Sequence, residues 1–271
     1  MIMVSVVMIT YGHEKYIEEA INGVLNQKCN FDFELILSND ASPDNTHSII
    51  QKILLTHPKA NLVKYTLHEK NIGMMPNSLY ALNLAKGKYI AFCEGDDYWT
   101  DNNKLQKQVE FMENHEDYVM SFHCVDVKLI DSNDNFFYPK PPRETLYLQD
   151  IIREHYIPTC SLIYRREIFQ NGYPKWFKNS ISGDIPLEIL LSSKGKTKYF
   201  DIPMACYRRN LGGISQSREQ ISKMRKGYIY MYSRILNEIG LVKGYHLLYK
   251  LARLIAGCIR NFILIKFKLT N

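Results

Sequence analysis

The chain has no cysteine pair spaced as C-x-x-C, although it contains six cysteines. These cysteines are scattered and several lie within apolar runs, which favours reduced thiols in the core of a cytosolic protein over disulfides or a zinc site. No apolar run approaches the length that crosses a bilayer. The first residues, Met1 to Val4, have neither a basic segment nor a small-residue cleavage site, so they predict a strand and not a signal peptide.

Two glycine-rich phosphate-binding motifs are also absent. No G-x-G-x-x-G follows the first apolar run, and no G-x-x-x-x-G-K-[ST] occurs. Their absence disfavours a Rossmann dehydrogenase and a P-loop enzyme. A nucleotide bound by this chain would instead have its phosphates neutralised by a metal ion held on acidic residues.

Acidic residues are missing from residues 241–271, and this segment accounts for the whole net charge of +6. Its basic residues are Lys243, Lys250, Arg253, Arg260, Lys266 and Lys268. Taking these six from the 34 basic residues leaves 28, which equals the number of acidic residues. The rest of the chain is therefore balanced, which argues against a nucleic-acid partner and for a localised basic element.

The remaining composition, 46% hydrophobic and 23% charged, is that of a soluble globular protein. A chain of 271 residues can bury a sizeable core in one domain with a small appendage. Apolar runs alternate with helical patterns in the N-terminal third. They predict strands at 3–10, 31–38, 62–67 and 89–93, separated by helices at 17–26, 46–55 and 76–85. This alternation indicates an α/β fold with a largely parallel sheet.

The middle of the chain is less regular. We predict a helix at 104–115, strands at 119–130, 159–166 and 200–207, a turn at 131–135 and an irregular segment at 138–143. A loop that selects a substrate would lie in this section, and a plain surface connection is an equally good interpretation of it.

Polar side chains follow three of the predicted strands, at the point where each strand ends. Tyr11 follows the first strand, Asp40 the second, and Glu94, Asp96 and Asp97 the fourth. Ligands of parallel sheets bind beyond these carboxyl ends, so we expect one shared crevice. Carboxylates that crowd at a strand end repel one another unless a cation lies between them. Their hard oxygen atoms suit Mg²⁺ or Mn²⁺.

Four segments together resemble the nucleotide-binding half of the family 2 glycosyltransferases. They are VSVVMITYG from residue 4, FELILSNDASPDNT from residue 33, NIG from residue 71 and EGDDYW from residue 94. The match covers residues 3–115 in order and spacing, although each segment alone is a weak signal. Members of this family are inverting enzymes with the GT-A fold that use nucleotide-diphosphate sugars. Many of them act in bacterial polysaccharide biosynthesis.

The resemblance implies roles for individual side chains. Tyr11 would stack on the base, Asp40 would hydrogen-bond it, and Asp97 would ligate the metal, Mn²⁺ or Mg²⁺. The nucleotide-binding positions that it implies are Thr10, Tyr11, Asp40, Asn71, Gly73, Asp96 and Arg208. Asp96 faces the ribose and diphosphate and also belongs to the expected metal site. A carboxylate at residue 40 would accept a hydrogen bond from a uracil N–H, which favours a uridine nucleotide.

Two positions depart from the family's pattern. The family commonly has Asp where this chain has Asn39, and often Asp where it has Glu94. Asn39 is not the position expected to read the base. Glu94 leaves open which acids of the cluster contact the metal.

The segment from Ser182 to Glu188 contains the expected catalytic base. Asp184 precedes a helical pattern with an apolar face, so from the residues alone helix capping is the better interpretation. The resemblance places the general base of the inverting transfer on Asp184. Such a base takes the proton of the acceptor hydroxyl as its oxygen attacks the sugar. Glu188, one turn further on, is the alternative.

The basic residues after the last predicted strand have two interpretations. Family members carry a similar Tyr-Arg pair and a glycine-containing loop, here at 207–215, which closes over the diphosphate. Arg208 would then contact phosphate, because a guanidinium pairs well with phosphate oxygens. A solvated loop arginine is an equally good interpretation.

The C-terminal residues predict a helix at 217–239 and a second helix in the tail. Basic side chains recur on one face of the second helix at Lys243, His246, Lys250, Arg253 and Arg260. This pattern resembles an amphipathic helix at an anionic membrane surface, where a lipid-linked acceptor would be found. The other interpretation is a helix that packs on the domain with its basic side in water.

These observations predict a GT-A glycosyltransferase domain at 1–216, with a nucleotide-binding half at 1–115 and an acceptor half at 116–216. A helical extension follows at 217–271. The partners would be a nucleotide-diphosphate sugar and a saccharide or lipid-linked saccharide, at the cytoplasmic face of the membrane. The alternatives are an inactive binding module with the same fold and a nucleotidyltransferase. The second should carry a basic glycine-rich loop after the first strand, which the sequence from Tyr11 to Glu14 does not provide.

Overall fold

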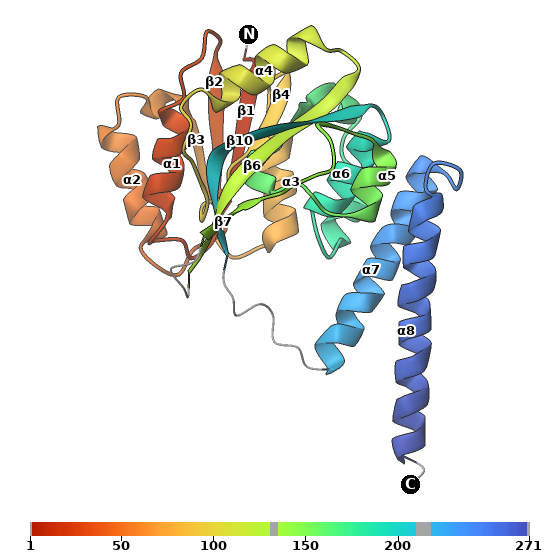
Figure 1. Ribbon diagram of the computed structural model, residues 1–271. Coiled ribbons are helices and arrows are strands. Elements are labelled where there is room, and N and C mark those ends of the chain that lie inside the picture. Colours follow the sequence, from red (N-terminus) through yellow and green to blue (C-terminus); the bar gives the residue numbers. More distant parts are fainter. Residues whose placement is uncertain (1, 131–134, 210–217, 270–271) are drawn as a thin grey trace.

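The computed structural model describes the backbone of residues 2–130, 135–209 and 218–269, and their side chains except those of 218–222 and 258–269. Its described strands form one sheet with the order β3-β2-β1-β4-β9-β6-β10-β5. Helices cover both faces of this sheet, and two long helices extend from one side of it (Figure 1). This α/β architecture is the one that the strand and helix alternation predicts.

The first half of the sheet is parallel. It contains β1 (Val4–Thr10), β2 (Phe33–Asn39), β3 (Val63–Leu67) and β4 (Tyr89–Phe92). The connecting helices are α1 (Ile17–Leu25), α2 (Thr46–Thr56) and α3 (Met74–Leu84), and a 3₁₀ turn, η1 (Ala60–Leu62), precedes β3. The parallel register brings the carboxyl ends of β1, β2 and β4 to one edge of the sheet, as expected for a ligand site.

Alternation along β1 builds the two cores. Val4, Val6 and Met8 belong to the cluster that includes α1 and α4 (Lys104–Asn114). Val7 belongs to the opposite cluster, which includes α3 and α6 (Asp184–Ser192). Because successive side chains of a strand point to opposite faces, a strand buried on both sides is mostly apolar, and the buried Ser5 of β1 is paired with Glu34 of β2.

The second half of the sheet is mixed. The long strands β6 (Tyr118–Leu129) and β10 (Lys196–Arg209) pair in parallel, while β9 (Ile163–Arg165) is antiparallel to both β4 and β6. Three 3₁₀ turns flank β9 and precede α6, namely η2 (Thr159–Ser161), η3 (Arg166–Phe169) and η4 (Lys175–Asn179). These turns connect β9 to α6, and the start of α6 lies near the edge of the sheet at which β4 ends.

Four short elements of the middle section are absent from the sequence-based prediction. They are β5 (Tyr98–Trp99), β7 (Asn135–Tyr138), β8 (Thr145–Leu146) and α5 (Leu148–Arg153). The predicted irregular segment thus begins with the last residue of β7, and the predicted strand at 159–166 is a 3₁₀ turn followed by a three-residue strand. Helix α3 starts two residues before Pro76, because a proline in the first turn removes an N–H that has no partner within the helix.

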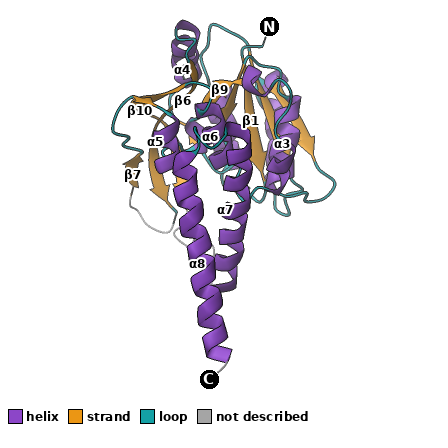
Figure 2. Cartoon of the chain, turned by 90° about the vertical axis from the view of Figure 1, so that its right-hand side faces the viewer, coloured by secondary structure: helices purple, strands orange, loops and turns teal. Residues whose placement is uncertain are grey.

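The C-terminal helices α7 (Arg218–Ile239) and α8 (Tyr245–Leu269) form a hairpin that packs beside α5 and α6 (Figure 2). Gly240, with φ of 80°, follows the last turn of α7. Leu247 and Leu251 of α8 are buried, so the first half of α8 is part of the core. Within the described residues, no helix combines the length and apolarity needed to cross a membrane.

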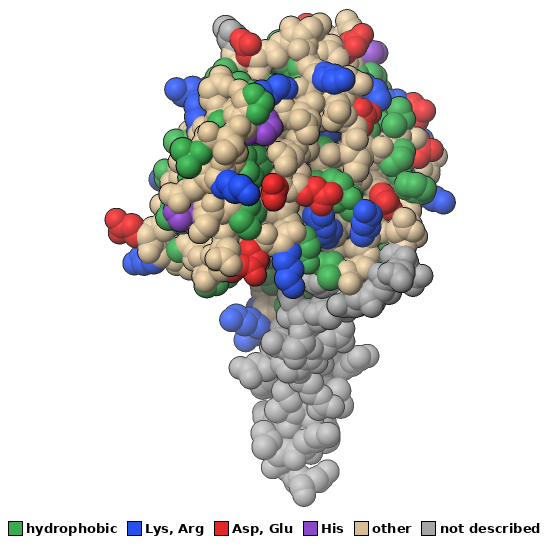
Figure 3. Space-filling model, turned by 90° about the vertical axis from the view of Figure 1, so that its left-hand side faces the viewer, with side chains coloured by type: hydrophobic (Ala, Val, Ile, Leu, Met, Phe, Trp, Pro, Cys, Tyr) green, Lys and Arg blue, Asp and Glu red, His purple; other side chains and the backbone are tan. Residues whose placement is uncertain are grey.

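Five of the six cysteines have described side chains, and all five are free thiols. Four of these thiols are buried, and Cys29 is half-buried. On the face shown in Figure 3, acidic and basic side chains are interspersed over the body of the domain. This distribution agrees with the balanced charge of the chain before residue 241.

Candidate functional site

The end of β1 carries an exposed aromatic ring. Tyr11 is 49% exposed, whereas Thr10 before it is buried. The hydroxyl of Thr10 lies 3.2 Å from Nδ1 of His13. Gly95 packs against this pair so closely that a Cβ atom there would lie 2.6 Å from Thr10 Oγ1. The acidic loop after β4 can therefore approach β1 because residue 95 has no side chain.

Asp40, at the end of β2, holds the loop before α3. Its side chain is buried, and its two oxygens accept hydrogen bonds from the backbone N–H groups of Ile72 (2.7 Å) and Gly73 (2.9 Å). Gly73 has φ of 93°, a conformation that favours glycine. Asn71, the predicted residue before them, is exposed. Each carboxylate oxygen keeps a second lone pair, so contact with a base stays a prediction.

Asn39 has a structural role. Its side-chain oxygen accepts hydrogen bonds from the N–H and the hydroxyl of Ser42, at 2.9 Å and 2.7 Å. Its amide nitrogen donates to the hydroxyl of Tyr65 at 3.1 Å. Both halves of the amide are thereby used, which explains how asparagine serves at this position.

The acidic loop after β4 places three carboxyl groups in different surroundings. Burial, and then the nearby charge of Asp96, raise the pKa of Asp97 to about 8. Burial raises the pKa of Glu94 well above its usual value, and Asp97 and Asp96 raise it further. Asp96 is the more exposed group, with one oxygen 3.8 Å from Nε2 of His13. Without a cation between them, these carboxyl groups therefore do not all ionise at neutral pH.

Arg208 of β10 holds the acidic loop through hydrogen bonds to Asp96 and Asp97. Its backbone N–H donates to Asp97 Oδ1 (2.8 Å), and its Nη1 donates to the backbone oxygen of Asp96 (2.6 Å). The guanidinium also pairs with Glu19 and lies between the rings of Tyr16 and Tyr98, 4.7 Å and 4.5 Å from their centroids. These contacts fix the position of the loop. Contact with phosphate stays a prediction, and the rest of the predicted loop, 210–215, lies outside the described residues.

Asp184 lies at the start of α6, where the helix dipole favours an anion. Gly183 occupies the position that precedes the helix, and the carboxylate of Asp184 accepts hydrogen bonds from the hydroxyl of Ser182 and from the N–H of Ile185 (2.9 Å). Asp184 is thus the first residue of the helix, and no side chain caps it, so the capping interpretation is wrong for Asp184. Its carboxylate also lines a cavity.

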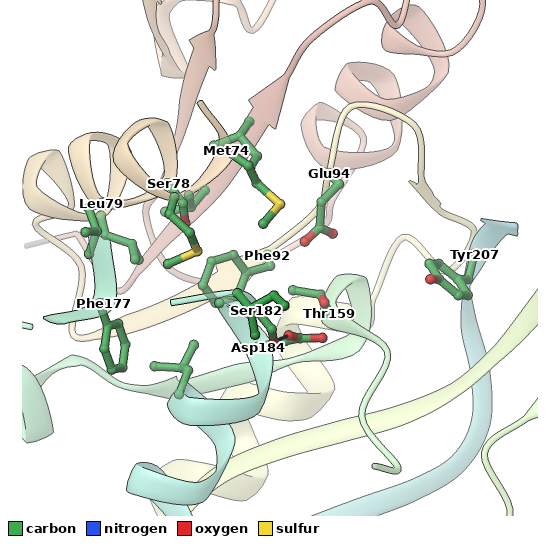
Figure 4. Close-up of a pocket in the computed structure, with 17 residues that line it drawn as sticks. Met74, Ser78, Leu79, Phe92, Glu94, Thr159, Phe177, Ser182, Asp184 and Tyr207 are labelled. Carbon is green, nitrogen blue, oxygen red and sulfur yellow. Dashed lines mark hydrogen bonds between the residues drawn. The ribbon is translucent and has the colours of Figure 1, made fainter. Parts of the chain in front are cut away.

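Two cavities meet at Asp184. The larger, of about 580 Å³, runs between α3 and α6 and reaches Glu94, and most of its lining is apolar. Figure 4 shows that Glu94 and Asp184 approach this cavity from different elements. The smaller cavity, of about 250 Å³, is lined by His155 and Arg209 among others. Thr159, Asp184 and Tyr207 line both cavities.

Glu188 lies one turn beyond Asp184 and is 1% exposed. Its Oε2 is 3.5 Å from Nδ1 of His155. Burial raises the pKa of Glu188 to about 7, and the charge of Asp184 adds to this shift, while His155 opposes it. Glu188 is therefore buried one turn beyond Asp184 and lines neither of the two cavities.

A divalent cation fits the chemistry of the acidic loop. Oε2 of Glu94 is buried and has no hydrogen-bond partner among the described residues. Asp96 and Asp97 add carboxylate oxygens, the ligands that Mg²⁺ and Mn²⁺ prefer. Over the described ranges, no group of three or more His, Cys, Asp or Glu side chains forms a complete metal site. Oxygens of a substrate would have to complete the coordination.

The structure thus gathers most predicted residues along one edge, with Tyr11, Asp40 and the acidic loop at the strand ends and Asp184 opposite. The sequence reasoning missed His13 and His155 as residues of the site. His13 lies three residues after the predicted strand end and was visible as a polar residue there. His155 comes from a segment without a recognisable motif, so only the tertiary structure reveals it. Tyr207 belongs to the Tyr-Arg pair that the resemblance singled out, and Thr159 belongs to a predicted strand.

The family model described as glycosyl transferase family 2 matches residues 5–172, more than half of the chain. The chain belongs to this glycosyltransferase family. The resemblance recognised in the four sequence segments is confirmed.

Two curated relatives show how far the similarity extends. The chain is 36% identical to the protein Rv1520 of Mycobacterium tuberculosis over 214 residues, 79% of this chain and 60% of that protein. It is 29% identical to the putative teichuronic acid biosynthesis glycosyltransferase TuaG of Bacillus subtilis, over 82% of this chain and 84% of TuaG. The glycosyltransferase therefore spans about three fifths of its mycobacterial relative.

Solved structures confirm the GT-A fold. S. aureus TarS 1–349, in complex with UDP-GlcNAc, matches 93% of this chain and 72% of its own with a TM-score of 0.68 and 19% identity. The mannosyltransferase PcManGT of Pyrobaculum calidifontis, in complex with GDP-Man and Mn²⁺, matches 95% of this chain and 75% of its own with a TM-score of 0.59 and 14% identity. At these identities the likeness concerns the fold alone.

Proposed function

We propose that the protein transfers a sugar from a nucleotide-diphosphate sugar to an acceptor hydroxyl, with inversion at the anomeric carbon. The observation that carries this proposal is the position of Asp184 between two cavities. The larger cavity reaches the acidic loop through Glu94 and would hold the donor sugar. The smaller cavity would admit the acceptor from the other side. A carboxylate shared by both cavities is placed for general-base catalysis.

In the proposed step the acceptor oxygen attacks the anomeric carbon while its proton passes to Asp184. The bond between that carbon and the diphosphate oxygen breaks, and the diphosphate leaves with the bonding electrons. No covalent enzyme intermediate is needed, since the attacking and leaving oxygens lie on opposite faces of the sugar. The buried Glu188, one turn beyond Asp184, is the alternative base.

The nucleotide would bind where β1, β2 and β4 end. Tyr11 offers an exposed ring for a base, with Asp40 and the loop from Asn71 to Gly73 beside it. We propose a uridine nucleotide, in line with the UDP-GlcNAc bound to TarS. Mn²⁺ or Mg²⁺ would be held by Asp97 and Asp96, and when bound it would stabilise the charge on the departing diphosphate.

We place this reaction in surface-polysaccharide assembly, such as capsule, exopolysaccharide or O-antigen synthesis. The similarity to TuaG supports this context. The acceptor would be a saccharide or a lipid-linked saccharide at the cytoplasmic face of the membrane. The basic residues of α8 and the exposed apolar side chains beside them support a location at a membrane surface.

A thermal-shift panel of nucleoside diphosphates with and without Mn²⁺ tests the donor site. A ligand that binds only the folded state adds about 2.7 kcal/mol of stability at a hundred times its Kd. We expect a metal-dependent shift with UDP that Asp97→Ala abolishes. A shift with GDP alone would keep the reaction and change the donor. The absence of a shift with every nucleotide would instead favour an inactive binding module.

Asp184→Asn tests the catalytic role. General-base catalysis contributes about 10²- to 10⁴-fold, so we expect kcat for hydrolysis of the donor to fall by this range while the nucleotide affinity stays the same. Asp117→Asn, at an exposed aspartate outside the site, is the matched control. Near-wild-type kcat in Asp184→Asn, with intact donor binding, would assign the base to another residue. Glu188→Gln would then be measured in the same assay.

A further inference from the structure

A third cavity lies between the two C-terminal helices, away from Asp184. It has a volume of about 380 Å³. Figure 2 shows α7 and α8 side by side along this part of the hairpin. Its lining includes Arg225, Tyr228 and Tyr232 from α7 and Lys250, Arg253 and Leu254 from α8.

Among the residues with described side chains, the lining of the cavity carries three positive charges and no acidic group. Lys250 and Arg253 are three residues apart on α8, so their charges lie on the same side of the helix. Arg225 donates a hydrogen bond from Nη1 to the backbone oxygen of Gly257 at 3.0 Å, which holds its guanidinium across the gap between the helices. Like charges placed together in this way repel one another unless an anion binds between them.

The pKa of Lys250 reflects its position in this cavity. The residue is half-buried, and burial lowers the pKa of its ammonium group, while the charge of Glu154 acts in the opposite direction. Its Nζ lies 6.0 Å from the centroid of the Tyr232 ring. An anion in the cavity would stabilise the charged form of Lys250. Ammonium and guanidinium groups beside aromatic hydroxyls form a suitable environment for a phosphate group.

An exposed apolar stripe on α8 borders the cavity. Its large exposed side chains are Tyr245, Leu248, Tyr249 and Ile255. Tyr245 and Tyr249 lie on the side of α8 away from Leu247 and Leu251, whereas Leu248 and Ile255 lie within one turn of Leu251, at the edge of the buried face. The guanidinium of Arg253 lies 5.8 Å from the Tyr249 ring, so the stripe and the cavity are continuous. Apolar side chains flanked by basic ones are typical of helices that lie at an anionic lipid surface.

We propose that the cavity between α7 and α8 binds the phosphate group of an anionic membrane lipid through Arg225, Lys250 and Arg253. The apolar stripe of α8 would then face the acyl boundary of the same leaflet. A free phosphate ion would satisfy the same three cations, but it gives no role to the stripe. The inference rests on membrane association and does not depend on the chemistry at Asp184.

Vesicle flotation of the full chain tests this site. The probes are phosphatidylcholine vesicles with and without phosphatidylglycerol. The test variant is Lys250→Gln with Arg253→Gln, and the matched control is Lys223→Gln with Arg234→Gln, which removes two exposed charges of α7 outside the cavity. With about fivefold for each basic side chain at such a surface, we expect the test variant to bind roughly 30-fold more weakly. The control should change binding by less than about threefold.

Three results would overturn the proposal. Equal losses in both double variants would show a general electrostatic attraction, and an absence of wild-type flotation with phosphatidylglycerol would exclude the lipid. The third result comes from titration with inorganic phosphate. The proposal fails if phosphate binds the wild type and not the test variant, while vesicles bind neither protein. A melting curve for each variant shows that it folds. The UDP thermal shift separately reports whether the donor site exists.

Discussion

At the residue scale, Glu188 shows how the site's second carboxyl group affects stability. Burial raises the pKa of Glu188 to about 7 from its usual 4.5. Between these pH values the folded protein keeps a proton that the unfolded chain has released, so the free energy of unfolding falls as pH rises through this window. A shift of this size corresponds to roughly 3 kcal/mol.

We therefore expect Glu188→Gln to remove this decline. The variant should be about as stable as the wild type near pH 4.5, where Glu188 is protonated in the folded state, and more stable by up to about 3 kcal/mol at about pH 8. Urea denaturation across this range measures the difference. Glu144→Gln, at an exposed glutamate, is the control. Parallel curves for wild type and Glu188→Gln would contradict the raised pKa.

Tyr11 carries a prediction about nucleotide affinity. Its ring is 49% exposed, so it contributes little to the core. Stacking of a base on an aromatic ring contributes about 1–3 kcal/mol. We expect Tyr11→Ala to raise the Kd of UDP by roughly 5- to 150-fold without lowering the melting temperature, and Tyr11→Phe to retain most of the affinity. Calorimetric titration measures both. Equal affinities in all three proteins would place the base elsewhere.

The residues that could be predicted from the sequence are those whose signal is local. Tyr11, Asp40 and Asp97 each lie within a few residues of the end of an apolar run, and parallel strands bring such positions together. The contacts of Arg208 could not be predicted in this way, because it meets Asp97 and Glu19 across 111 and 189 residues of chain. The contact between His155 and Glu188 could not be predicted either, because the loop that carries His155 and the helix that carries Glu188 share no sequence pattern.

At the scale of elements, Asp40 links the end of β2 to the start of α3. In Asp40→Asn the remaining side-chain oxygen can accept from only one of the N–H groups of Ile72 and Gly73. The new NH₂ group faces the other N–H, so two hydrogen-bond donors oppose each other. We expect a loss of about 1–3 kcal/mol in stability and faster hydrogen exchange at both amides. Asp32→Asn, at an exposed aspartate, is the control. Unchanged protection of Ile72 and Gly73 would show that the loop does not depend on this carboxylate.

Elements were predictable in proportion to their length and pattern. The buried strands β1 and β2 are mostly apolar runs, and α1 repeats its apolar residues at helical spacing. The two-residue strands β5 and β8 are too short to show any period, and α5 has only six residues. Their positions are set by pairing with β10 and by packing on α6, which are interactions of the folded chain.

At the scale of the whole molecule, the sequence located the excess positive charge correctly but not the environment of each side chain. Helix α8 has three sides, with Leu247 and Leu251 in the core, Lys250 and Arg253 at the cavity, and an apolar stripe in solvent. The prediction of a basic face holds for His246, Lys250 and Arg253, whereas Lys243 lies in the turn before α8. Packing on the domain holds as well. The side chain of Arg260 lies outside the described residues.

This division of α8 separates two contributions to membrane binding that respond differently to salt. Leu248→Ser with Ile255→Ser removes two partly exposed apolar side chains from the stripe. Burial of such side chains contributes roughly 1.5–3 kcal/mol in total, so vesicle binding should fall roughly 10- to 100-fold. The remaining binding should keep its full dependence on salt, because screening acts on the charges that are still present.

Flotation of the full chain at low and high salt measures both quantities, with Leu55→Ser as the control. Leu55 is 87% exposed on α2, on a different part of the surface, so its substitution should change neither the affinity nor the salt dependence. If the stripe variant binds as well as the wild type at both salt concentrations, the apolar side of α8 does not enter the lipid. Attachment would then depend on charge alone, and the hairpin would be held above the membrane surface without insertion.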